Sequence, residues 1–171
     1  MINDNDDGLT RSQLETMFGR AFSLWQNVTD FNFSMSHSNE ADIIISFEHR
    51  PHDDGIPIVL PFDKKVLAHA FYPLDNKDLA GDIHFNDDQH FTLGREGGTN
   101  IFWVAVHEIG HSLGLKHSKV RDAVMHKHYK EYPDGPIKLH EDDVNGINTL
   151  YGKYSVSQLG YLFRRNFVGQ K

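Results

Sequence analysis

Residues 107–117 read HEIGHSLGLKH, and the rest of the chain is best interpreted outward from this stretch. On a helix, His107 and His111 lie one turn apart on the same face, because four residues complete slightly more than one turn. Glu108 projects about 100° away from His107. The spacing predicts a helix that presents two imidazoles and a neighbouring carboxylate.

A glycine and a third histidine follow this helical pattern. Gly114 can adopt the positive φ that commonly ends a helix, so the chain can turn and bring His117 to the same point. Three imidazoles are typical zinc ligands, and they leave the fourth tetrahedral position for water. We therefore predict a catalytic Zn²⁺ site with Glu108 as general base. An amphipathic helix with surface histidines is the alternative, which the third histidine disfavours.

A methionine follows at a distance that extends the motif. Met125, in the run AVMH, lies eight residues after His117. Its polarizable thioether could pack beneath the three imidazoles, although a lone methionine is more often ordinary core. A long H-E-x-x-H-x-x-G-x-x-H motif followed by such a Met-turn is the metzincin signature.

At this point the chain resembles the matrix metalloproteinases, or matrixins, of the metzincin clan. The likeness covers nearly the whole chain, through RSQL at 11–14, FSLW at 22–25, ADI at 41–43, LAHA at 67–70, GDIHF at 81–85 and GINTLYG at 146–152. It implies an α+β fold: one metzincin-like domain, with a twisted mixed β-sheet, three helices and the active-site helix under the cleft. We expect residues 1–152 to be the catalytic domain and residues 153–171 a C-terminal tail or linker.

The resemblance also implies an activity and a location. A matrixin is a zinc-dependent endopeptidase, here expected to cut extracellular or matrix-type proteins with Glu108 as general base. The family is secreted or held at the cell surface, and it is made with a propeptide whose cysteine caps the zinc. This chain has no cysteine and resembles the mature catalytic domain. The expected partners are peptide or protein substrates and the protein inhibitors of matrix metalloproteinases, and the chain is expected to be a monomer.

A second, structural zinc is implied by four residues that match the family pattern. They are His52, Asp54, His69 and His84, whose nitrogen and oxygen atoms suit a closed tetrahedral site. Without the resemblance, each would be interpreted as a surface side chain. Residues 55–60 make the loop after Asp54 longer than is usual in the family.

Calcium sites are less well matched. Lys64 and Lys65 bring positive charge to the loop where the family binds Ca²⁺, and Asn86 and Gln89 replace expected carboxylates; each of these changes weakens a site that needs oxygen ligands and negative charge. Asp42 and Asp82 match the ligands of a different family calcium, which backbone carbonyls from residues 75–80 would complete. Aspartates near strand ends are otherwise usually just solvated.

The resemblance implies that substrate binds as an added strand along the edge carrying Leu67 and Ala68, with one side chain in a pocket beside the metal. Trp103 lies four residues before His107, so it is expected on the metal face of the helix, where an indole should shorten that pocket. Core packing is an equally good interpretation of Trp103. Tyr129 matches the opposite wall.

Two further positions carry predictions from the resemblance. Lys127 stands where the family has a proline, and losing that fixed φ should alter the wall of the pocket. Asp143 resembles the aspartate that ties the closing helix to the Met-turn, a role that steadies metal ligands through Met125 and its neighbours.

Length and composition exclude several other classes of protein. With 171 residues, of which 39% are hydrophobic, the chain can form one domain with a proper core. A net charge of −7 without a basic stripe argues against nucleic-acid binding. The lack of cysteine excludes disulfides and a thiolate zinc site. The sequence contains no stretch of about 20 apolar residues, which is the length needed to span a membrane.

Periodicity predicts the order of the main elements. Helices are expected at Ser12–Gln26, with Thr10 or Ser12 as cap, at Asn100–Leu113, with Thr99 or Asn100 as cap, and at Glu141–Tyr151. Strands are expected at Asp42–Phe47, Val66–Phe71 and Asp82–Phe85. Strands that precede two of the three helices favour an α+β fold.

Two rival functions remain open on the residues alone. GHSLG at 110–114 fits the G-x-S-x-G elbow of serine hydrolases, but that elbow needs a strand before Ser112, where a helix is predicted. The second rival is a catalytically inactive, zinc-stabilised binding module. Glu108 disfavours it, because a structural zinc site needs no free carboxylate beside an open coordination position.

Overall fold

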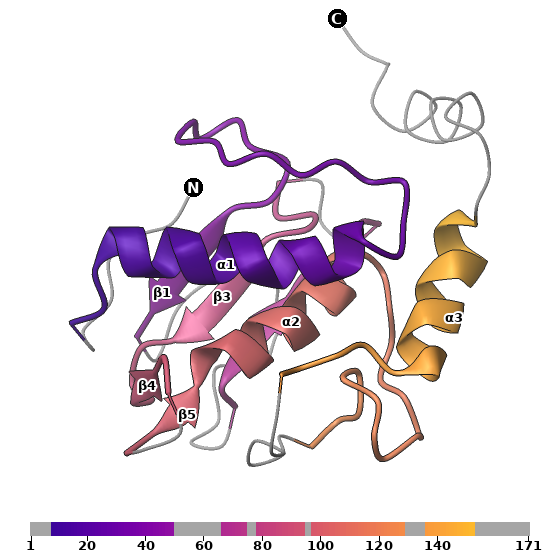
Figure 1. Ribbon diagram of the computed structural model, residues 1–171. Helices are drawn as coiled ribbons and strands as arrows, with labels where there is room; N and C mark the ends of the chain where they lie inside the picture. Colours follow the sequence, from indigo (N-terminus) through magenta and orange to yellow (C-terminus); the bar gives the residue numbers. More distant parts are fainter. Residues whose placement is uncertain (1–7, 50–65, 75–77, 95–96, 129–135, 153–171) are drawn as a thin grey trace, which may run out of the picture.

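The computed structural model describes residues 8–49, 66–74, 78–94, 97–128 and 136–152. Figure 1 shows the elements in chain order. They are α1 (Arg11–Gln26), β1 (Ile45–Glu48), β2 (Ala68–Ala70), β3 (Ile83–Asn86), β4 (Phe91–Thr92), β5 (Thr99–Asn100), α2 (Ile101–Ser112) and α3 (Glu141–Tyr151). The α+β class is confirmed.

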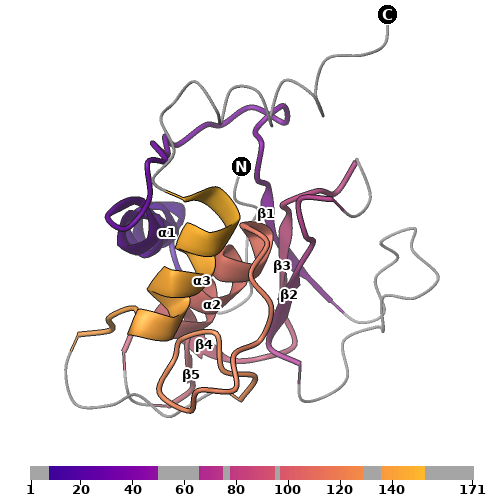
Figure 2. The same cartoon turned by 90° about the vertical axis from the view of Figure 1, so that its right-hand side faces the viewer.

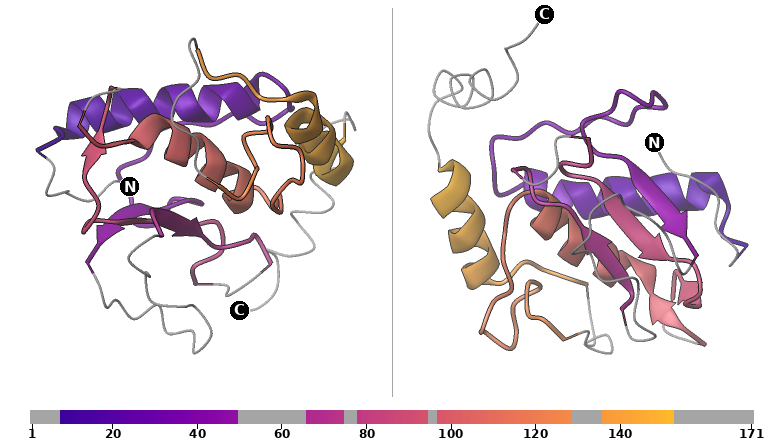
Figure 3. Two further views of the ribbon diagram at one scale, coloured as in Figure 1. Left: turned by 90° about the horizontal axis from the view of Figure 1, so that it is seen from below. Right: turned by 180° about the vertical axis from the view of Figure 1, so that it is seen from behind.

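The main sheet is mixed, as predicted. Its strand order is β1-β3-β2, with β1 parallel and β2 antiparallel to β3. In Figure 2 the helices lie on one side of this sheet, and the view from below in Figure 3 shows α1 and α2 stacked over it. The layer between these helices and the sheet is the hydrophobic core, and it includes Phe18, Trp25, Phe85 and Ile109.

The first helix begins with a capping box. The Thr10 hydroxyl accepts a hydrogen bond from the Gln13 backbone N–H at 3.3 Å, and the Gln13 side chain accepts one from the Thr10 N–H at 2.8 Å. This pair satisfies two of the N–H groups that a helix start leaves without partners. The helix therefore begins one residue before the predicted Ser12, with Thr10 as its cap.

The second helix is held at both ends and along one side. The Asn100 side chain accepts hydrogen bonds from the N–H groups of Phe102 and Trp103 at 3.0 and 3.3 Å, so Asn100 is the cap rather than the first helical residue. Gly114 has a φ of 97°, as expected for the residue that turns the chain after the helix. The Trp25 indole N–H donates to the Val106 carbonyl at 2.9 Å and joins α1 to α2.

The sheet differs from the prediction in detail. β1 begins at Ile45 rather than Asp42, because the Ile44 N–H donates to the Asp82 side chain at 2.8 Å instead of to a strand. β2 is shorter than the predicted Val66–Phe71, and β3 begins and ends one residue later than the predicted Asp82–Phe85. The parallel pair β4–β5 was not predicted, since strands of two residues show no usable alternation. The third helix has the predicted bounds.

In the described ranges, no helix combines the length and apolar character needed to cross a membrane.

Candidate metal centre

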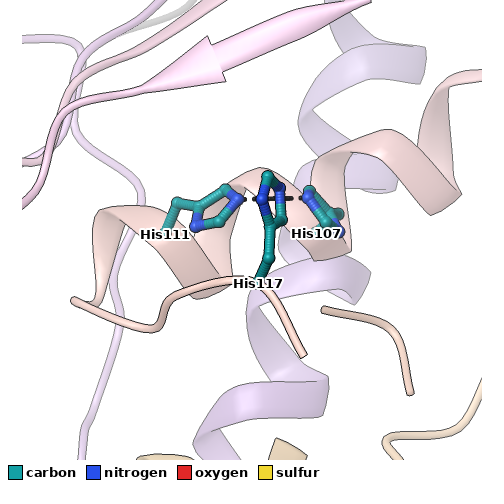
Figure 4. A group of neighbouring side chains, drawn as sticks. All are labelled: His107, His111 and His117. Carbon is teal, nitrogen blue, oxygen red and sulfur yellow. Dashed lines mark hydrogen bonds between the residues drawn. The ribbon is translucent and has the colours of Figure 1, made fainter. Parts of the chain in front are cut away.

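Three imidazoles converge at the end of α2 (Figure 4). His107 and His111 come from the helix and His117 from the segment that follows Gly114. One nitrogen of each ring lies within 4.8 Å of the others, and Nε2 of His107 is 3.1 Å from Nε2 of His111. This is the one group of three or more potential metal ligands among the described residues. The structure thus brings together the three histidines that the spacing singled out.

Backbone carbonyls fix the tautomers of two rings. Nδ1 of His107 lies 2.7 Å from the Val124 oxygen, and Nδ1 of His111 lies 2.6 Å from the Leu115 oxygen. A carbonyl can only accept, so each Nδ1 carries the proton and each Nε2 keeps its lone pair. The two lone pairs face the shared space, which is the arrangement that a bound zinc requires.

The protonation state of the rings also fits a metal. Burial lowers the pKa of His107 to about 3, with a further contribution from His111, and burial lowers the pKa of His111 to about 4. The pKa of His117 is lowered first by burial and then by His126, Lys127 and His128. Neutral imidazole is the form that binds metal, so the site favours the ligand state.

Glu108 is the unusual carboxyl group of the site. Its side chain is almost fully enclosed, with 6% exposure, and its Oε2 atom has no hydrogen-bond partner among the described residues. Burial raises the pKa of Glu108 to about 8. A buried carboxyl group without a partner destabilises a fold, so its presence beside clustered ligands is typical of a functional group.

Asp143 at the start of α3 holds the segment beneath the histidines. Its two carboxylate oxygens accept hydrogen bonds from the N–H groups of Val124, Met125 and His140 at 2.8, 3.0 and 2.8 Å. Val124 in turn accepts the Nδ1 proton of His107. Asp143 is therefore linked to a ligand ring through one residue of backbone.

The underside of α2 is tightly packed at Gly110. A Cβ atom added there would collide with the Met125 thioether and lie 2.9 Å from the Trp25 ring. Met125 is 2% exposed. Because glycine has no side chain, Met125 and Trp25 can contact the helix directly beside the three histidines.

Trp103 both packs in the core and contacts the site. Its ring lies parallel to the His107 ring, with centroids 5.5 Å apart and an interplanar angle of 16°. It also belongs to the hydrophobic core cluster. The two interpretations of Trp103 are thus compatible, because the ring spans the boundary between core and metal centre.

Ser112 does not have the environment of a nucleophile. It is the last residue of α2, it is buried, and its hydroxyl donates to the Gly81 carbonyl at 2.6 Å. A serine elbow would place the hydroxyl at the top of a strand. The serine hydrolase interpretation is therefore wrong.

Two of the four residues predicted to bind the second zinc, His69 and His84, lie in the described part of the chain. His69 and His84 are direct partners across β2 and β3, and their ring centroids are 5.2 Å apart. His52 and Asp54 lie outside the described residues, as does Tyr129 of the predicted pocket. The pair of histidines is suitably placed for two ligands of one ion, and the second zinc stays a prediction.

The predicted calcium ligands differ in environment. Asp82 is buried and accepts a hydrogen bond from the Ile44 N–H at 2.8 Å, whereas Asp42 is exposed. Burial raises the pKa of Asp82, and this shift is opposed by the Ile44 hydrogen bond. A nearby cation would offset the cost of burying the charge of Asp82, which is compatible with a bound Ca²⁺. The calcium site stays a prediction.

Some contacts at the site have no signal in the sequence. The carbonyls of Val124 and Leu115 orient two rings, but backbone groups are the same at every position. Tyr72 meets the His111 ring edge to face at 5.8 Å, and it follows the LAHA motif closely enough to have been considered.

A helix that carries two histidines, a glycine turn before the third and a mixed sheet behind them define a metzincin-like domain. A family model described as Matrixin matches residues 1–152. The chain belongs to the matrixin family.

Three relatives illustrate the similarity. The chain is 42% identical to stromelysin-1 of Mus musculus over 158 residues, which cover 92% of this chain and 32% of the relative. It is 44% identical to stromelysin-1 of Rattus norvegicus over 84% of this chain and 30% of that protein. It is 40% identical to macrophage metalloelastase of Rattus norvegicus, again over 84% and 30%. The chain thus spans about a third of the length of the curated relatives it matches.

Proposed function

We propose that this chain is a zinc-dependent endopeptidase. The observation that carries the proposal is the convergence of three imidazoles beside the buried carboxyl group of Glu108, whose Oε2 atom has no hydrogen-bond partner among the described residues. A site that only stabilised the fold would close around its metal and would not need this carboxyl group. Membership of the matrixin family supports the same reaction.

The roles of the residues follow from their chemistry. Zinc, when bound, supplies a Lewis acid that polarises the scissile carbonyl and activates water. Glu108 would accept a proton from the attacking water and pass it to the leaving amine. Burial raises the pKa of Glu108 to about 8, and the positive charge of a bound zinc would favour the carboxylate form that the first transfer needs. His107 and His111 keep their lone pairs toward the metal because backbone carbonyls hold their other nitrogens.

The edge of β2 supports binding of an extended peptide. Within the described part of the sheet, β2 is an edge strand. The Asn86 N–H donates to the Leu67 carbonyl. The Phe71 N–H donates to the Asp82 carbonyl, and the Phe71 carbonyl accepts the Gly81 N–H, so the backbone groups of Leu67 and Phe71 point toward β3. Backbone groups alternate along a strand, which turns those of Ala68 outward. Added peptide strands bind to such groups whatever their sequence.

We further propose that a pocket beside the metal selects one side chain of the substrate. Trp103 and Tyr129 are its proposed walls, and the stacking of Trp103 on His107 supports an indole close to the bound carbonyl. The bulk of that ring favours small or medium side chains just after the cut. Selection of large aromatic side chains at this position in a peptide library would contradict the short pocket.

The proposed setting is extracellular. This proposal rests on the similarity to stromelysin-1 and macrophage metalloelastase. On the same basis we propose that the substrates are matrix-type proteins, that protein inhibitors of matrix metalloproteinases bind the chain, and that the chain is a monomer. We also propose a structural zinc held by His69 and His84 with His52 and Asp54, and a calcium held by Asp42 and Asp82. The pairing of His69 with His84 supports the zinc, and the burial of Asp82 supports the calcium.

Elemental analysis tests these additional metals. His84→Ala is expected to lose the second zinc equivalent and keep the first, because His84 is not one of the three histidines that converge at α2. Asp82→Asn is expected to lose calcium and keep both zincs. His37→Ala is the control, since this exposed histidine lies near Glu15 and outside both proposed sites. Equal zinc content in His84→Ala and the control would exclude the structural zinc.

Peptide cleavage by the purified 171-residue chain tests the main proposal. We expect internal cuts in a random peptide library, loss of cleavage with a zinc chelator, and recovery when zinc is restored. A serine-directed reagent should have no effect. A chain that binds zinc and folds but cuts nothing would instead be the inactive binding module.

A further inference from the structure

Asn86, the last residue of β3, carries a buried amide that joins two segments of the chain. Its exposed fraction is 0%. Its Nδ2 group donates to the Val66 carbonyl at 2.8 Å, and its Oδ1 atom accepts the Asp88 N–H at 3.2 Å. A carbonyl can only accept and an N–H can only donate, so these partners determine which end of the amide is nitrogen. Residues 66, 67, 86 and 88 are here called the Asn86 corner.

The Asn86 corner positions the start of the edge strand. The Asn86 backbone N–H donates to the Leu67 carbonyl at 2.9 Å, so the side chain and backbone of one residue bind the consecutive carbonyls of Val66 and Leu67. These two residues lead directly into β2, the strand to which the peptide substrate is proposed to add. The position of β2 relative to β3 therefore depends, at this end, on the Asn86 side chain.

The Asn86 corner does not fit a calcium ion, although the family resemblance implies one in the loop of Lys64 and Lys65 that Val66 follows. Calcium binds oxygen atoms, and carboxylates supply the charge. Asn86 presents nitrogen to the Val66 carbonyl, and its one side-chain oxygen accepts the Asp88 N–H. A carboxylate at position 86 would place two acceptors face to face, which requires a cation or a proton between them. The amide supplies that proton itself.

The neighbouring carboxylates do not supply the ligands that Asn86 lacks. Asp87 and Asp88 lie beside His49, with carboxylate oxygens 3.8 and 3.2 Å from its ring nitrogens. Within the described ranges, the histidines at the end of α2 are the one group of three or more side chains placed to bind a metal. The acidic side chains next to the Asn86 corner are thus near the end of β1 and do not form a cation site with Val66.

We propose that the Asn86 amide takes the place of a bound calcium ion at this corner, so that the edge strand β2 keeps its position without calcium. The consequence for substrate binding rests on the proposed function, because it assumes that β2 receives the peptide. The consequence for stability does not. A segment held by an ion loses its support when the ion is scarce, whereas hydrogen bonds from a buried amide form with the fold itself.

Thermal unfolding of the zinc-loaded 171-residue chain, with and without calcium, tests the consequence for stability. The buffer is freed of calcium on a chelating resin and zinc is then restored. Asp82→Asn is the background, because it removes a ligand of the separate calcium proposed above and keeps an oxygen that can accept the Ile44 N–H. Asp42→Asn, at an exposed ligand of that same site, is a second background. We expect calcium to change the Tm of both by less than about 1 °C, and a larger rise would overturn the inference.

Asn86→Asp, measured without calcium, tests whether the amide holds the corner. The change sets a carboxylate against the Val66 carbonyl, so we expect the Tm to fall by about 4–10 °C. Asn39→Asp is the matched control, since it adds the same charge at an exposed position and should change the Tm by at most about 2 °C. Asn86→Ala removes the amide without adding charge and should also lower the Tm. Equal Tm values for the Asn86 variants and the control would overturn the inference.

Peptide cleavage without calcium tests the consequence for substrate binding. Asn86→Asp and Asn86→Ala should raise KM by about 2- to 10-fold, the scale of one backbone hydrogen bond, with a smaller change in kcat. Zinc content should stay the same, because no metal ligand is changed. A KM equal to that of Asn39→Asp would show that the Asn86 corner does not position the substrate edge. An unmodified chain that cuts no peptide would contradict the proposed function, and the Tm comparisons would still decide whether the amide replaces the ion.

Discussion

Exchange of Glu108 for glutamine is expected to lower kcat for peptide cleavage by at least about 10²-fold, the usual scale for losing a general base. Glutamine has the same shape but cannot accept the proton of the attacking water. The change should preserve the fold, because Oε2 of Glu108 makes no hydrogen bond within the described structure and the neutral amide is easier to bury than a carboxylate.

Zinc content and KM are the controls for Glu108→Gln. Because His107, His111 and His117 are untouched, zinc content should match that of the unmodified chain, and KM should change far less than kcat. Loss of zinc together with activity would mean that Glu108 supports the metal rather than the proton transfer. Full activity in the variant would show that another group is the base.

Removal of the Asp143 side chain is expected to have the largest effect on stability. Asp143→Ala leaves three backbone N–H groups without their acceptor: those of the buried Val124 and Met125 and that of the partly buried His140. Hydrogen bonds to a charged group are worth about 1.5–3 kcal/mol each, and the losses overlap, so we expect the free energy of unfolding to fall by about 3–5 kcal/mol. Denaturant unfolding of the zinc-loaded chain measures this change.

Asp142→Ala is the matched control for Asp143→Ala. Asp142 precedes Asp143 in the same helix turn but is exposed, and its side chain accepts a hydrogen bond from the Ser118 hydroxyl. Its loss should cost about 1 kcal/mol or less. Asp143→Ala should also weaken zinc binding by about 10- to 100-fold, because the Val124 carbonyl that orients His107 is no longer held. Equal stability of the two variants would show that the three hydrogen bonds do not hold this segment.

The sequence was most informative where periodicity and spacing act over one element. The 3.6-residue pattern and the caps predicted three helices within a residue or two, and the histidine spacing singled out the three rings that meet. Both signals are local, since a helix fixes the relative positions of residues four apart.

The sequence was least informative where a role depends on contacts between distant residues. Asp82 accepts the Ile44 N–H from 38 residues away, so β1 begins later than predicted, and β4 and β5 have two residues each, too few to show alternation. The function of Trp103 could not be decided either, because burial in the core and contact with His107 require the same apolar side chain.

The glycine at position 110 has a consequence for the order in which the molecule assembles. A helix gains intrinsic stability from alanine and loses it with glycine, so Gly110 weakens the last turn of α2 as an isolated segment. What replaces that stability is contact with Trp25 from α1 and Met125 from the loop beyond His117. We therefore expect the three histidine rings to reach their final positions late in folding, after Trp25 and Met125 have packed against α2. A newly made chain would then bind zinc at these rings only after its hydrophobic core has formed.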